Sequence, residues 1–214
     1  MLFEDRRDAG IRLAKALRKY KGQDIVVFAL PRGGVVLGEK IAREFNAPLD
    51  LIITKKVGHP SNPEYAICAV AEQGEPICNS LELERVDPSW FQNELTKVRQ
   101  EIMRRRIEYL GDALTKDVEG KTTIIVDDGI ATGYTMMAAI LELKKRKPKR
   151  VVVAIPVTPY ETAQTLLSMA DDLISLDIDR NYLGAVGAYY KDFRQVEDEE
   201  VIALLKSANR NVAI

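Results

Sequence analysis

The stretch "IIVDDGIATGYTM", residues 124–136, decides how the rest of the chain is interpreted. A short apolar run ends in two adjacent carboxylates, Asp127 and Asp128, and a turn rich in glycine and threonine follows. Like charges side by side repel each other and resist removal from water, so a buried strand rarely ends in them without a use for them. We therefore expect a strand whose end binds a ligand.

Comparable apolar runs alternate with helical patterns along the chain. The expected strands are residues 24–30, 49–54, 122–126, 150–157 and 171–176. The expected helices between or before them are residues 6–20, 38–45 and 135–146. Apolar strands that alternate with helices are typical of a parallel sheet covered on both faces. The pattern predicts a Rossmann-like α/β fold with an open, twisted, mainly parallel sheet, in which ligands bind beyond the carboxyl ends of the strands.

Composition narrows the class of protein. The 214 residues suit a single domain, and 46% apolar residues suffice for a sizeable core. A net charge of −1 argues against a general nucleic-acid binder, and no apolar run approaches the length of a membrane span. The start, "MLFEDRRDAG", lacks the apolar segment of a signal peptide, and Cys68 and Cys78 are too few for a disulfide framework. We expect a cytoplasmic protein with reduced thiols and no membrane partner.

The turn after the acid pair predicts the ligand. A helix that begins near Thr135 or Met136 offers unpaired N–H groups and a positive dipole end, which together hold a phosphate. Carboxylates repel phosphate but accept hydrogen bonds from a sugar diol, with a divalent cation able to share the site. The alternative is a plain Asp-Gly turn with solvated acids. The residues around it contain neither a Walker motif nor GxGxxG, so a ligand with one phosphate and a diol fits better.

Two other expected strand ends carry groups suited to an anion. "PRGG", residues 31–34, combines the cation of Arg32 with two glycines that permit close backbone approach, although it also fits an ordinary strand-to-helix turn. The strand at 49–54 leads into Lys55 and Lys56 and then into residues 57–66, which are rich in Gly, Pro, Ser and Asn. This composition predicts a mobile lid that closes over the ligand.

Residues 87–118 interrupt the alternation as a helical insertion. Asp87 is a plausible helix cap and Pro88 suits the first helical position, which predicts a long helix over 87–110. An apolar stripe with heptad-like spacing follows, at Phe91, Leu95, Val98 and Ile102. This stripe fits a helix packed on its own domain, and a homodimer contact is the alternative.

At this point the motifs resemble a known family. "VDDGIATGYT" resembles the phosphoribosyl-diphosphate signature of the type I phosphoribosyltransferases. Further motifs are similar to a subfamily of phosphoribosyltransferases with unspecified base, namely "FEDRRDAGIRLAKAL", "ALPRGGVVLGEKIA", "KKVGHPSNPEYAICAVAE", "AIPVTP" and "AVGAYYKDFRQVEDEEV". The resemblance implies one domain over residues 1–214 that ends in a small hood over about 178–214.

The resemblance also implies roles for individual residues. Asp127 and Asp128 would bind the ribose hydroxyls. The loop around the 5′-phosphate would be Ala131, Thr132, Gly133, Tyr134 and Thr135. The pyrophosphate site would be Arg32, Gly33, Gly34, Lys55 and Lys56. Mg²⁺ is the implied cofactor, bound through the substrate and with Asp127 and Asp128 as candidate protein ligands.

The same resemblance implies catalytic roles for Arg32, Lys56 and Glu64. Ala131 stands where hypoxanthine–guanine members carry an aspartate proposed as the acid or base, so proton transfer would fall to Glu64 or His59 in the lid. His59 also fits a solvated loop residue. Lys55 stands where an arginine is usual, which keeps the charge but loses the bidentate fork.

The segment "YLGAVGAYYKDF", residues 182–193, is rich in aromatic residues where family members place the hood. The candidate contacts with a base are Val186, Tyr189, Tyr190 and Phe193, and packing of a small terminal subdomain is the alternative. "VEDEEVIALL" after it predicts a helix with acids in its first turn. "KKRKPKR", residues 144–150, is more simply the positive last turn of a helix than a nucleic-acid patch.

The leading hypothesis is therefore an enzyme of nucleotide salvage. It would transfer ribose 5-phosphate between phosphoribosyl diphosphate and a nucleobase or related nitrogen nucleophile, and release pyrophosphate. The alternative is a sensor that binds phosphoribosyl diphosphate without catalysis and regulates a partner. A phosphotransfer domain with an aspartyl phosphate is a third hypothesis, but the further acid and lysine that it needs at fixed places are missing.

Overall fold

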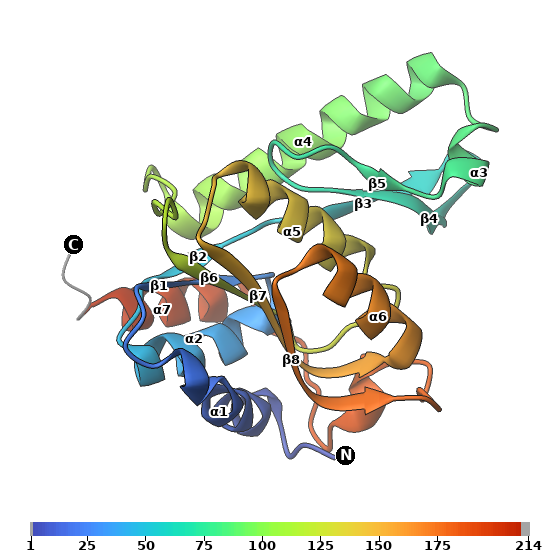
Figure 1. Cartoon of the computed structure of the whole chain (residues 1–214). Helices are drawn as coiled ribbons and strands as arrows, with labels where there is room; N and C mark the ends of the chain where they lie inside the picture. Colours follow the sequence, from blue (N-terminus) through green and yellow to red (C-terminus); the bar gives the residue numbers. More distant parts are fainter. Residues whose placement is uncertain (1, 211–214) are drawn as a thin grey trace.

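The computed structural model describes residues 2–210, and its centre is a five-stranded sheet (Figure 1). The strand order is β2-β1-β6-β7-β8, and every neighbouring pair is parallel. The strands are β1 (Ile25–Ala29), β2 (Leu49–Leu51), β6 (Thr122–Val126), β7 (Arg150–Pro159) and β8 (Asp172–Asp179). The α/β fold with a mainly parallel sheet is thereby confirmed.

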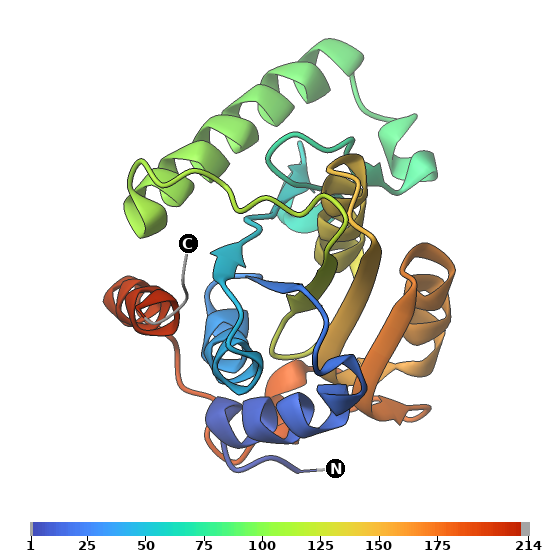
Figure 2. The same cartoon turned by 60° about the vertical axis from the view of Figure 1, so that its left-hand side comes forward.

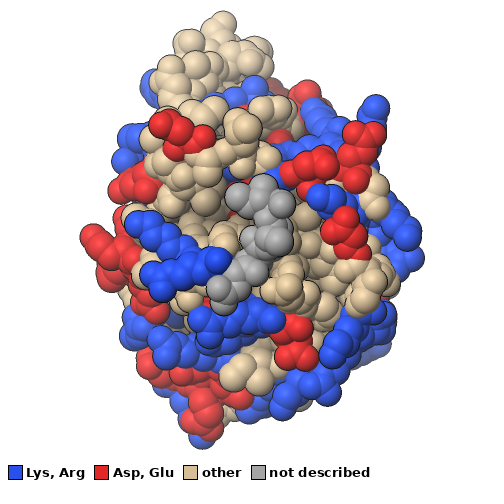
Figure 3. All heavy atoms as spheres, turned by 90° about the vertical axis from the view of Figure 1, so that its left-hand side faces the viewer, with Lys and Arg blue, Asp and Glu red and all other residues tan. Residues whose placement is uncertain are grey.

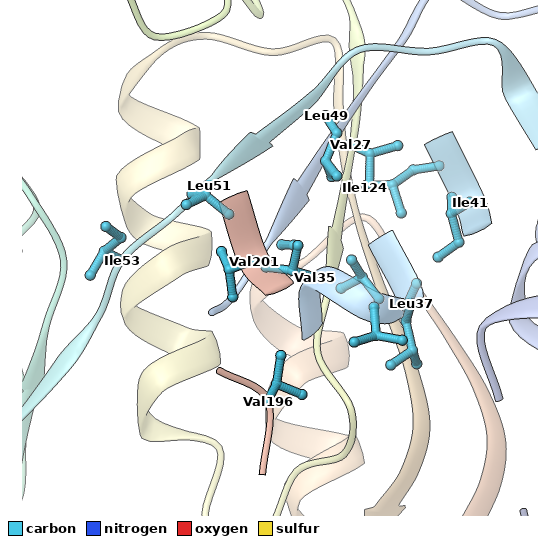
Figure 4. Packing of buried hydrophobic residues seen from close by; sticks show 14 of the residues in the cluster. Val27, Val35, Leu37, Ile41, Leu49, Leu51, Ile53, Ile124, Val196 and Val201 are labelled. Atoms are coloured by element: carbon cyan, nitrogen blue, oxygen red, sulfur yellow. The ribbon is translucent and has the colours of Figure 1, made fainter. Parts of the chain in front are cut away.

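Helices cover both faces of this sheet. One face carries α1 (Arg6–Ala16), which continues as the 3₁₀ turn η1 (Leu17–Tyr20), together with α2 (Gly33–Phe45) and α7 (Asp198–Asn209). The other face carries α5 (Tyr134–Lys145) and α6 (Tyr160–Met169). Successive strand residues point to opposite faces, so Val27 packs toward α2 (Figure 4) whereas Phe28 packs toward α5. The three central strands β1, β6 and β7 therefore read as largely apolar because both of their faces are buried, whereas the edge strand β8 is half-buried and more polar.

The register of the sheet brings two loops together. Ala29 at the end of β1 pairs with Val126 at the end of β6, so "PRGG" and the acid pair leave the sheet at the same level. The chain runs outward from β1 to β2 on one side and from β6 to β7 on the other. This reversal is a topological switch point, which is where open α/β sheets bind ligands.

A second, three-stranded sheet corrects the expectation of a loop after Lys56. The strands β3 (Lys55–His59), β4 (Asn62–Val70) and β5 (Ile77–Cys78) pair antiparallel, so residues 57–66 lie mostly in a hairpin. The turn residues, Pro60 and Ser61, are held by a 2.7 Å contact between His59 Nδ1 and Ser61 Oγ. The composition misled because Gly58 sits at an irregularity in the pairing, where a side chain would collide with the Pro63 carbonyl.

The expectation of reduced thiols is also corrected. Cys68 on β4 and Cys78 on β5 are cross-strand neighbours and form a disulfide. The sequence gives no sign of this pairing, because β5 is only two residues long and its apposition to β4 is a tertiary contact. The covalent link ties two strands of the small sheet together.

The long helix expected at 87–110 is present as α4 (Pro88–Leu110), which follows the short α3 (Ser80–Leu83). The Asp87 carboxylate caps α4 by accepting a hydrogen bond from the Trp90 N–H at 2.8 Å. The apolar stripe is buried within this chain at Phe91, Leu95, Val98 and Ile102. The stripe therefore packs the helix on its own chain, and a homodimer stays a prediction.

Near its end α4 is held by a buried ion cluster. Arg106, only 6% exposed, donates to Asp50 Oδ1 at 3.1 Å and to Glu72 Oε1 at 3.0 Å. Asp50 belongs to β2 and Glu72 follows β4, so one guanidinium joins the central sheet, the small sheet and α4. Figures 1 and 2 show this assembly at the opposite end of the molecule from α1.

The C-terminal part folds back onto the N-terminus. The 3₁₀ turn η2 (Val186–Tyr189) precedes an extended segment that leads to α7. The Phe3 N–H donates to the Tyr189 carbonyl, and the Lys191 N–H donates to the Phe3 carbonyl, both at 2.8 Å. Residues 189–191 thus lie beside the N-terminal Phe3. The expected hood over 178–214 extends beyond the described residues, since residues 211–214 lie outside the described part.

The basic run at 144–150 behaves as a helix end. Lys144 and Lys145 close α5, and Arg146 pairs with Glu142 one turn earlier at 2.7 Å. On the face drawn in Figure 3, positive and negative side chains are interspersed. None of the helices in residues 2–210 combines the length and apolarity needed to cross a membrane.

Candidate functional site

The acid pair lies directly beyond β6, at the switch point. The Asp128 N–H donates to Asp127 Oδ1 at 2.8 Å, so the first carboxylate fixes the backbone of the second. Asp128 Oδ2 accepts a hydrogen bond from Arg6 Nε at 2.7 Å, and the two side chains are only 15% and 11% exposed. The Tyr190 hydroxyl donates to the Asp128 carbonyl. Asp128 is therefore held by its surroundings and is not a freely solvated acid.

Burial makes these acids unusual. Removal from water, together with the charge of Asp128, raises the pKa of Asp127 well above its ordinary value. Burial also raises the pKa of Asp128, although the Arg6 guanidinium opposes that rise. Two carboxylates this close titrate as a coupled pair, so neither behaves as an isolated acid. Strongly perturbed acids in one cluster are a common sign of a functional site.

"PRGG" packs directly against the acid pair. A Cβ at Gly33 would lie 1.9 Å from Asp128 Oδ2, and a Cβ at Gly34 would lie 2.7 Å from the Val126 carbonyl. Glycine is thus needed at both positions because a side chain would collide with the Asp128 carboxylate or with the end of β6. The sequence predicted only that the glycines leave room for an anion. The peptide bond between Pro31 and Arg32 is cis. The Arg32 side chain reaches toward α7, 3.7 Å from Asp198 and 3.9 Å from Glu197.

The turn expected to bind phosphate begins α5, one residue earlier than predicted. Gly133 takes the N-cap position with φ 80°, a left-handed conformation that glycine adopts without strain. Within the described chain no side chain caps this helix start. Ile130 N–H donates to the Val157 carbonyl at 3.0 Å, and Thr162 Oγ1 donates to the Ala131 carbonyl at 2.8 Å. The loop is therefore braced from β7 and α6, while its helical N–H groups remain available.

The groups assigned to the leaving group lie farther out, on the small sheet. Lys55 Nζ is 3.8 Å from Glu101 Oε1 on α4, whereas Lys56 on the same strand is exposed. Glu64 is exposed near the hairpin turn. His59 holds that turn through Ser61, which gives it a structural role. The structure thus brings Gly33 and Gly34 to the acid pair, directs the Arg32 side chain toward Glu197 and Asp198, and leaves Lys56 and Glu64 exposed.

The hood aromatics require a correction. Tyr189 is 2% exposed, and its hydroxyl donates to Asp179 Oδ2 at 2.6 Å, so it is a core residue rather than a stacking platform. Tyr190 is also buried, with its ring centroid 5.2 Å from that of Phe3. Val186 packs against Gly129, where a Cβ would meet it at 2.4 Å. The subdomain-packing alternative therefore holds for Tyr189 and Tyr190, because a buried ring has no face left for a base, whereas the contact predicted near Val186 stays a prediction.

Phe193 has a different partner from the one expected. The guanidinium carbon of Arg6 lies 3.7 Å from the centre of the Phe193 ring, a cation–π contact. The ring also packs on Tyr190 at 4.9 Å between centroids. Phe193 thus supports the arginine that holds Asp128, and its contact with the site is through that arginine.

Two residues near the acids escaped the sequence analysis. Arg6 belongs to a motif that carries the family resemblance, but only the helical pattern of that motif was used. Tyr182 stacks on Tyr189 at 5.4 Å between centroids, and its hydroxyl is buried without a hydrogen-bond partner among the described residues. The negative charge of Asp128 contributes to raising the pKa of Tyr182, after burial. An unpartnered hydroxyl beside a binding site is a candidate ligand contact.

No cluster of three or more His, Cys, Asp or Glu side chains placed to hold a metal occurs in the part of the chain that the structure describes. The acid pair alone supplies two carboxylates. This set fits Mg²⁺, which commonly takes one or two carboxylates and completes its shell with water and substrate phosphate oxygens.

Comparisons with known proteins agree with this geometry. The family model described as "Phosphoribosyl transferase domain" matches residues 4–192. A Mycobacterium tuberculosis (strain ATCC 25618 / H37Rv) protein, Rv0571c, provisionally named a phosphoribosyl transferase, is 35% identical over 214 residues. That match covers 99% of this chain but only 48% of the relative, so the chain spans about half of that protein's length.

Solved structures extend the likeness to three dimensions. The crystal structure of TT1426 from Thermus thermophilus superposes with a TM-score of 0.82 at 39% identity, over 97% of this chain and 99% of that one. AQ2163 from Aquifex aeolicus shares the fold at 14% identity, with a TM-score of 0.51 over 81% and 74% of the two chains. With the family match and the acid pair at the switch point, these likenesses establish that the chain belongs to the phosphoribosyl transferase domain family, with the type I fold.

Proposed function

We propose that the protein transfers ribose 5-phosphate between phosphoribosyl diphosphate and a nitrogen nucleophile, either a nucleobase or a related amine. The observation that carries the proposal is the acid pair, which lies half-buried at the switch point and is followed, after a short turn, by an uncapped helix start. Acids that accept from a diol and N–H groups that donate to a phosphate suit the two ends of one ribose 5-phosphate. Asp127 and Asp128 bind the 2′- and 3′-hydroxyls in this proposal.

The 5′-phosphate then lies against the loop from Ala131 to Thr135. The N–H groups at the start of α5 point out of the helix, and the positive end of the helix dipole favours an anion there. Thr132 and Thr135 add hydroxyl donors, and Gly133 lets the loop turn tightly. The bracing of this loop by Thr162 and Val157 supports the proposal, because a preformed cradle need not be reorganised on binding.

Pyrophosphate departs from ribose C1 as the nucleophile attacks, through a transition state that resembles an oxocarbenium ion. Negative charge develops on the leaving group, so cations near it stabilise the transition state. Arg32 at the end of β1 and Lys55 and Lys56 at the start of the hairpin are the proposed cations, with the N–H groups of Gly33 and Gly34 beside Arg32. When bound, Mg²⁺ neutralises charge on the pyrophosphate, with Asp127 and Asp128 as its protein ligands.

The nucleophile side of the site is proposed at Tyr182. Its ring rests on Tyr189, and its buried hydroxyl is unpartnered beside the acids. A hydroxyl in this position donates to or accepts from a heterocycle edge. Glu64 is the proposed proton acceptor, and it reaches the nucleophile only if the hairpin moves inward, since it is exposed near the hairpin turn.

The organisation of the chain follows from these roles. We propose a single catalytic domain in which residues 87–118 form an insertion that supports the hairpin and residues from about 178 form the hood. A sensor that binds phosphoribosyl diphosphate without turnover is the second candidate. One observation favours it, namely that Lys56 and Glu64 are exposed and remote from the acid pair.

The test is pyrophosphate release from phosphoribosyl diphosphate and Mg²⁺ across adenine, guanine, hypoxanthine, xanthine, uracil and orotate. The enzyme hypothesis expects release that depends on one of these bases and disappears in Asp128→Asn. Calorimetry on the same samples reports binding independently of turnover. Tight binding without release for any base would support the sensor, and absence of binding would contradict both.

A further inference from the structure

Arg6 has a position that needs an explanation. It is the first residue of α1, where the helix dipole disfavours a positive charge. Its side chain is nevertheless ordered by three partners: Asp128 Oδ2 at 2.7 Å, the Arg194 carbonyl at 2.6 Å and the Phe193 ring at 3.7 Å. The next residue, Arg7, carries the same charge and is exposed. The contacts of Arg6 therefore depend on this particular side chain, since a positive charge at the start of α1 is not enough to make them.

The contact with Asp128 restrains the carboxylate from one side while Gly33 restrains it from another. A Cβ at Gly33 would come within 1.9 Å of Asp128 Oδ2 and within 2.9 Å of Arg6 Nε, so only glycine leaves room for the pair. Guanidinium–carboxylate hydrogen bonds are short and directional, and they fix the orientation of the acceptor. With Oδ2 engaged in this way, the remaining oxygen of Asp128 has a defined direction.

The same guanidinium connects Asp128 to the C-terminal segment 189–194. Arg6 Nη1 donates to the Arg194 carbonyl, and the backbone of Phe3 and Glu4 bonds to Lys191 and Asp192 at 2.8 and 2.9 Å. The Tyr190 hydroxyl reaches the Asp128 carbonyl from this segment. The N-terminal residues thus connect segment 189–194 to the Asp128 carboxylate. Arg6 and Asp128 are 122 residues apart in the sequence.

We propose that Arg6 is a positioning residue for the sugar, which orients the Asp128 carboxylate toward a ribose hydroxyl and docks segment 189–194 against it. The inference rests on the proposed function, because it takes the ribose diol as the ligand of the acid pair. Arg6 does not contact the pyrophosphate in this arrangement, since its guanidinium is occupied by the carboxylate, a backbone carbonyl and an aromatic ring. Its loss should therefore weaken sugar recognition selectively.

The experiment compares two ligands on three variants. Arg6→Met removes the charge but keeps an unbranched chain over Phe193, Arg6→Lys keeps the charge without the fork, and Arg7→Met is the matched control. Calorimetry in the presence of Mg²⁺ measures the Kd of phosphoribosyl diphosphate and, separately, of inorganic pyrophosphate. Thermal unfolding checks that each variant is folded.

We expect Arg6→Met to weaken phosphoribosyl diphosphate binding by about tenfold or more, because a charge-assisted contact that orients the ligand's acceptor is lost. Arg6→Lys should fall between it and the wild type, and Arg7→Met should match the wild type. Pyrophosphate affinity should be the same in all four proteins. Hydrogen exchange should also show reduced protection of the Lys191 and Asp192 amides in Arg6→Met.

Three outcomes overturn the inference. Phosphoribosyl diphosphate binding within twofold of the wild type in Arg6→Met would show that Asp128 needs no help from Arg6. Equal loss of both ligands in a folded variant would show that Arg6 acts on phosphate. If Arg6→Met does not fold, Arg6→Lys must show the selective loss, and its failure to do so counts against the role. Absence of binding in the wild type would instead contradict the proposed function itself.

Discussion

The acid-pair loop, residues 127–135, and the β3–β4 hairpin, residues 55–70, are the two regions that carry the candidate chemistry, and they are held very differently. The acid-pair loop is braced by α1, α2, α6, β7 and the C-terminal segment. The outer half of the hairpin is exposed from Asn62 to Tyr65, and its turn is held by its own His59 and Ser61. The acid-pair loop is held in place by its neighbours, whereas the outer half of the hairpin is exposed.

This difference suggests a division of labour. Groups for the sugar and its phosphate are fixed in the body of the protein, where they can select the ligand before reaction. Two of the cations proposed for the leaving group, Lys55 and Lys56, lie on the separate small sheet, which contacts the body chiefly through α4 and α5. The third, Arg32, belongs to the body. A rigid binding half and a movable half are what an enzyme needs if closure completes the site. The following predictions test this difference between the acid-pair loop and the hairpin.

The largest effect is expected at Arg106, which joins the small sheet to the body. Arg106→Met leaves Asp50 and Glu72 buried without their cation, and breaking a buried ion cluster costs about 3–5 kcal/mol of stability. Burial already raises the pKa of Glu72, so the loss should be greater at pH 8 than at pH 5, where more of this acid is neutral. Urea unfolding measures both values.

Arg104→Met is the matched control, because Arg104 lies on the exposed face of the same helix and pairs with Glu101 and Glu108 there. It should change stability by less than about 1 kcal/mol. Equal effects of the two substitutions would contradict the view that Arg106 anchors the hairpin to the body.

The next largest effect is expected at Lys56. Its ammonium is exposed in this structure and can contact pyrophosphate only after closure, so Lys56→Ala should lower kcat more than it raises KM. A cation in a water-excluded site contributes about 2–4 kcal/mol, or roughly a hundredfold in rate. Steady-state kinetics with whichever base of the panel supports pyrophosphate release provides the measurement, and Lys97→Ala on α4 is the control. An unchanged kcat would remove the hairpin from the catalytic scheme.

A smaller effect is expected at Asp127, where the substitution by Asn should raise stability but lower the affinity for phosphoribosyl diphosphate. Asp127→Asn keeps the acceptor for the Asp128 N–H but removes a buried charge beside Asp128. Because the pKa of Asp127 is raised in the fold, the wild type loses stability as the pH rises above the ordinary carboxyl pKa, and the loss is complete above the raised pKa. The variant should be more stable than the wild type at pH 8, a gain that fades toward pH 4.

Its affinity for phosphoribosyl diphosphate should meanwhile fall by about 1.5–3 kcal/mol through the lost charged hydrogen bond. Thermal unfolding across pH and calorimetry measure the two effects. A variant that is less stable at pH 8, or that binds as tightly as the wild type, would argue that the acids serve the fold and not the sugar.

The smallest effect concerns the hairpin itself. Amides of residues 57–66 should exchange faster than those of residues 127–135 in the free protein, since the former have fewer buried contacts. Phosphoribosyl diphosphate with Mg²⁺ should slow exchange in the hairpin and leave the acid-pair loop nearly unchanged. Equal protection of the hairpin with and without ligand would mean that it does not close.

Local pattern was enough for the main architecture. The β-branched runs predicted β1, β2, β6, β7 and β8 to within a few residues, since strands buried on both faces must be apolar throughout. The small sheet was missed because β3 and β4 carry glycine, proline and polar residues, which are typical of loops. Their strand conformation comes from pairing with each other and from packing under α4, neither of which has a local signal.

The sequence by itself determined that two acids follow a buried strand and precede a turn and the start of a helix, because strand, turn and helix signals are all local. It also marked Arg32, Gly33, Gly34, Lys55 and Lys56 as strand-end residues. Only the tertiary structure decided what those acids touch: Arg6 lies 122 positions away, and Tyr190 comes from a segment after the last strand. Such contacts depend on how α1 and the segment after η2 pack beside the end of β6, and spacing along a sequence carries no information about that packing.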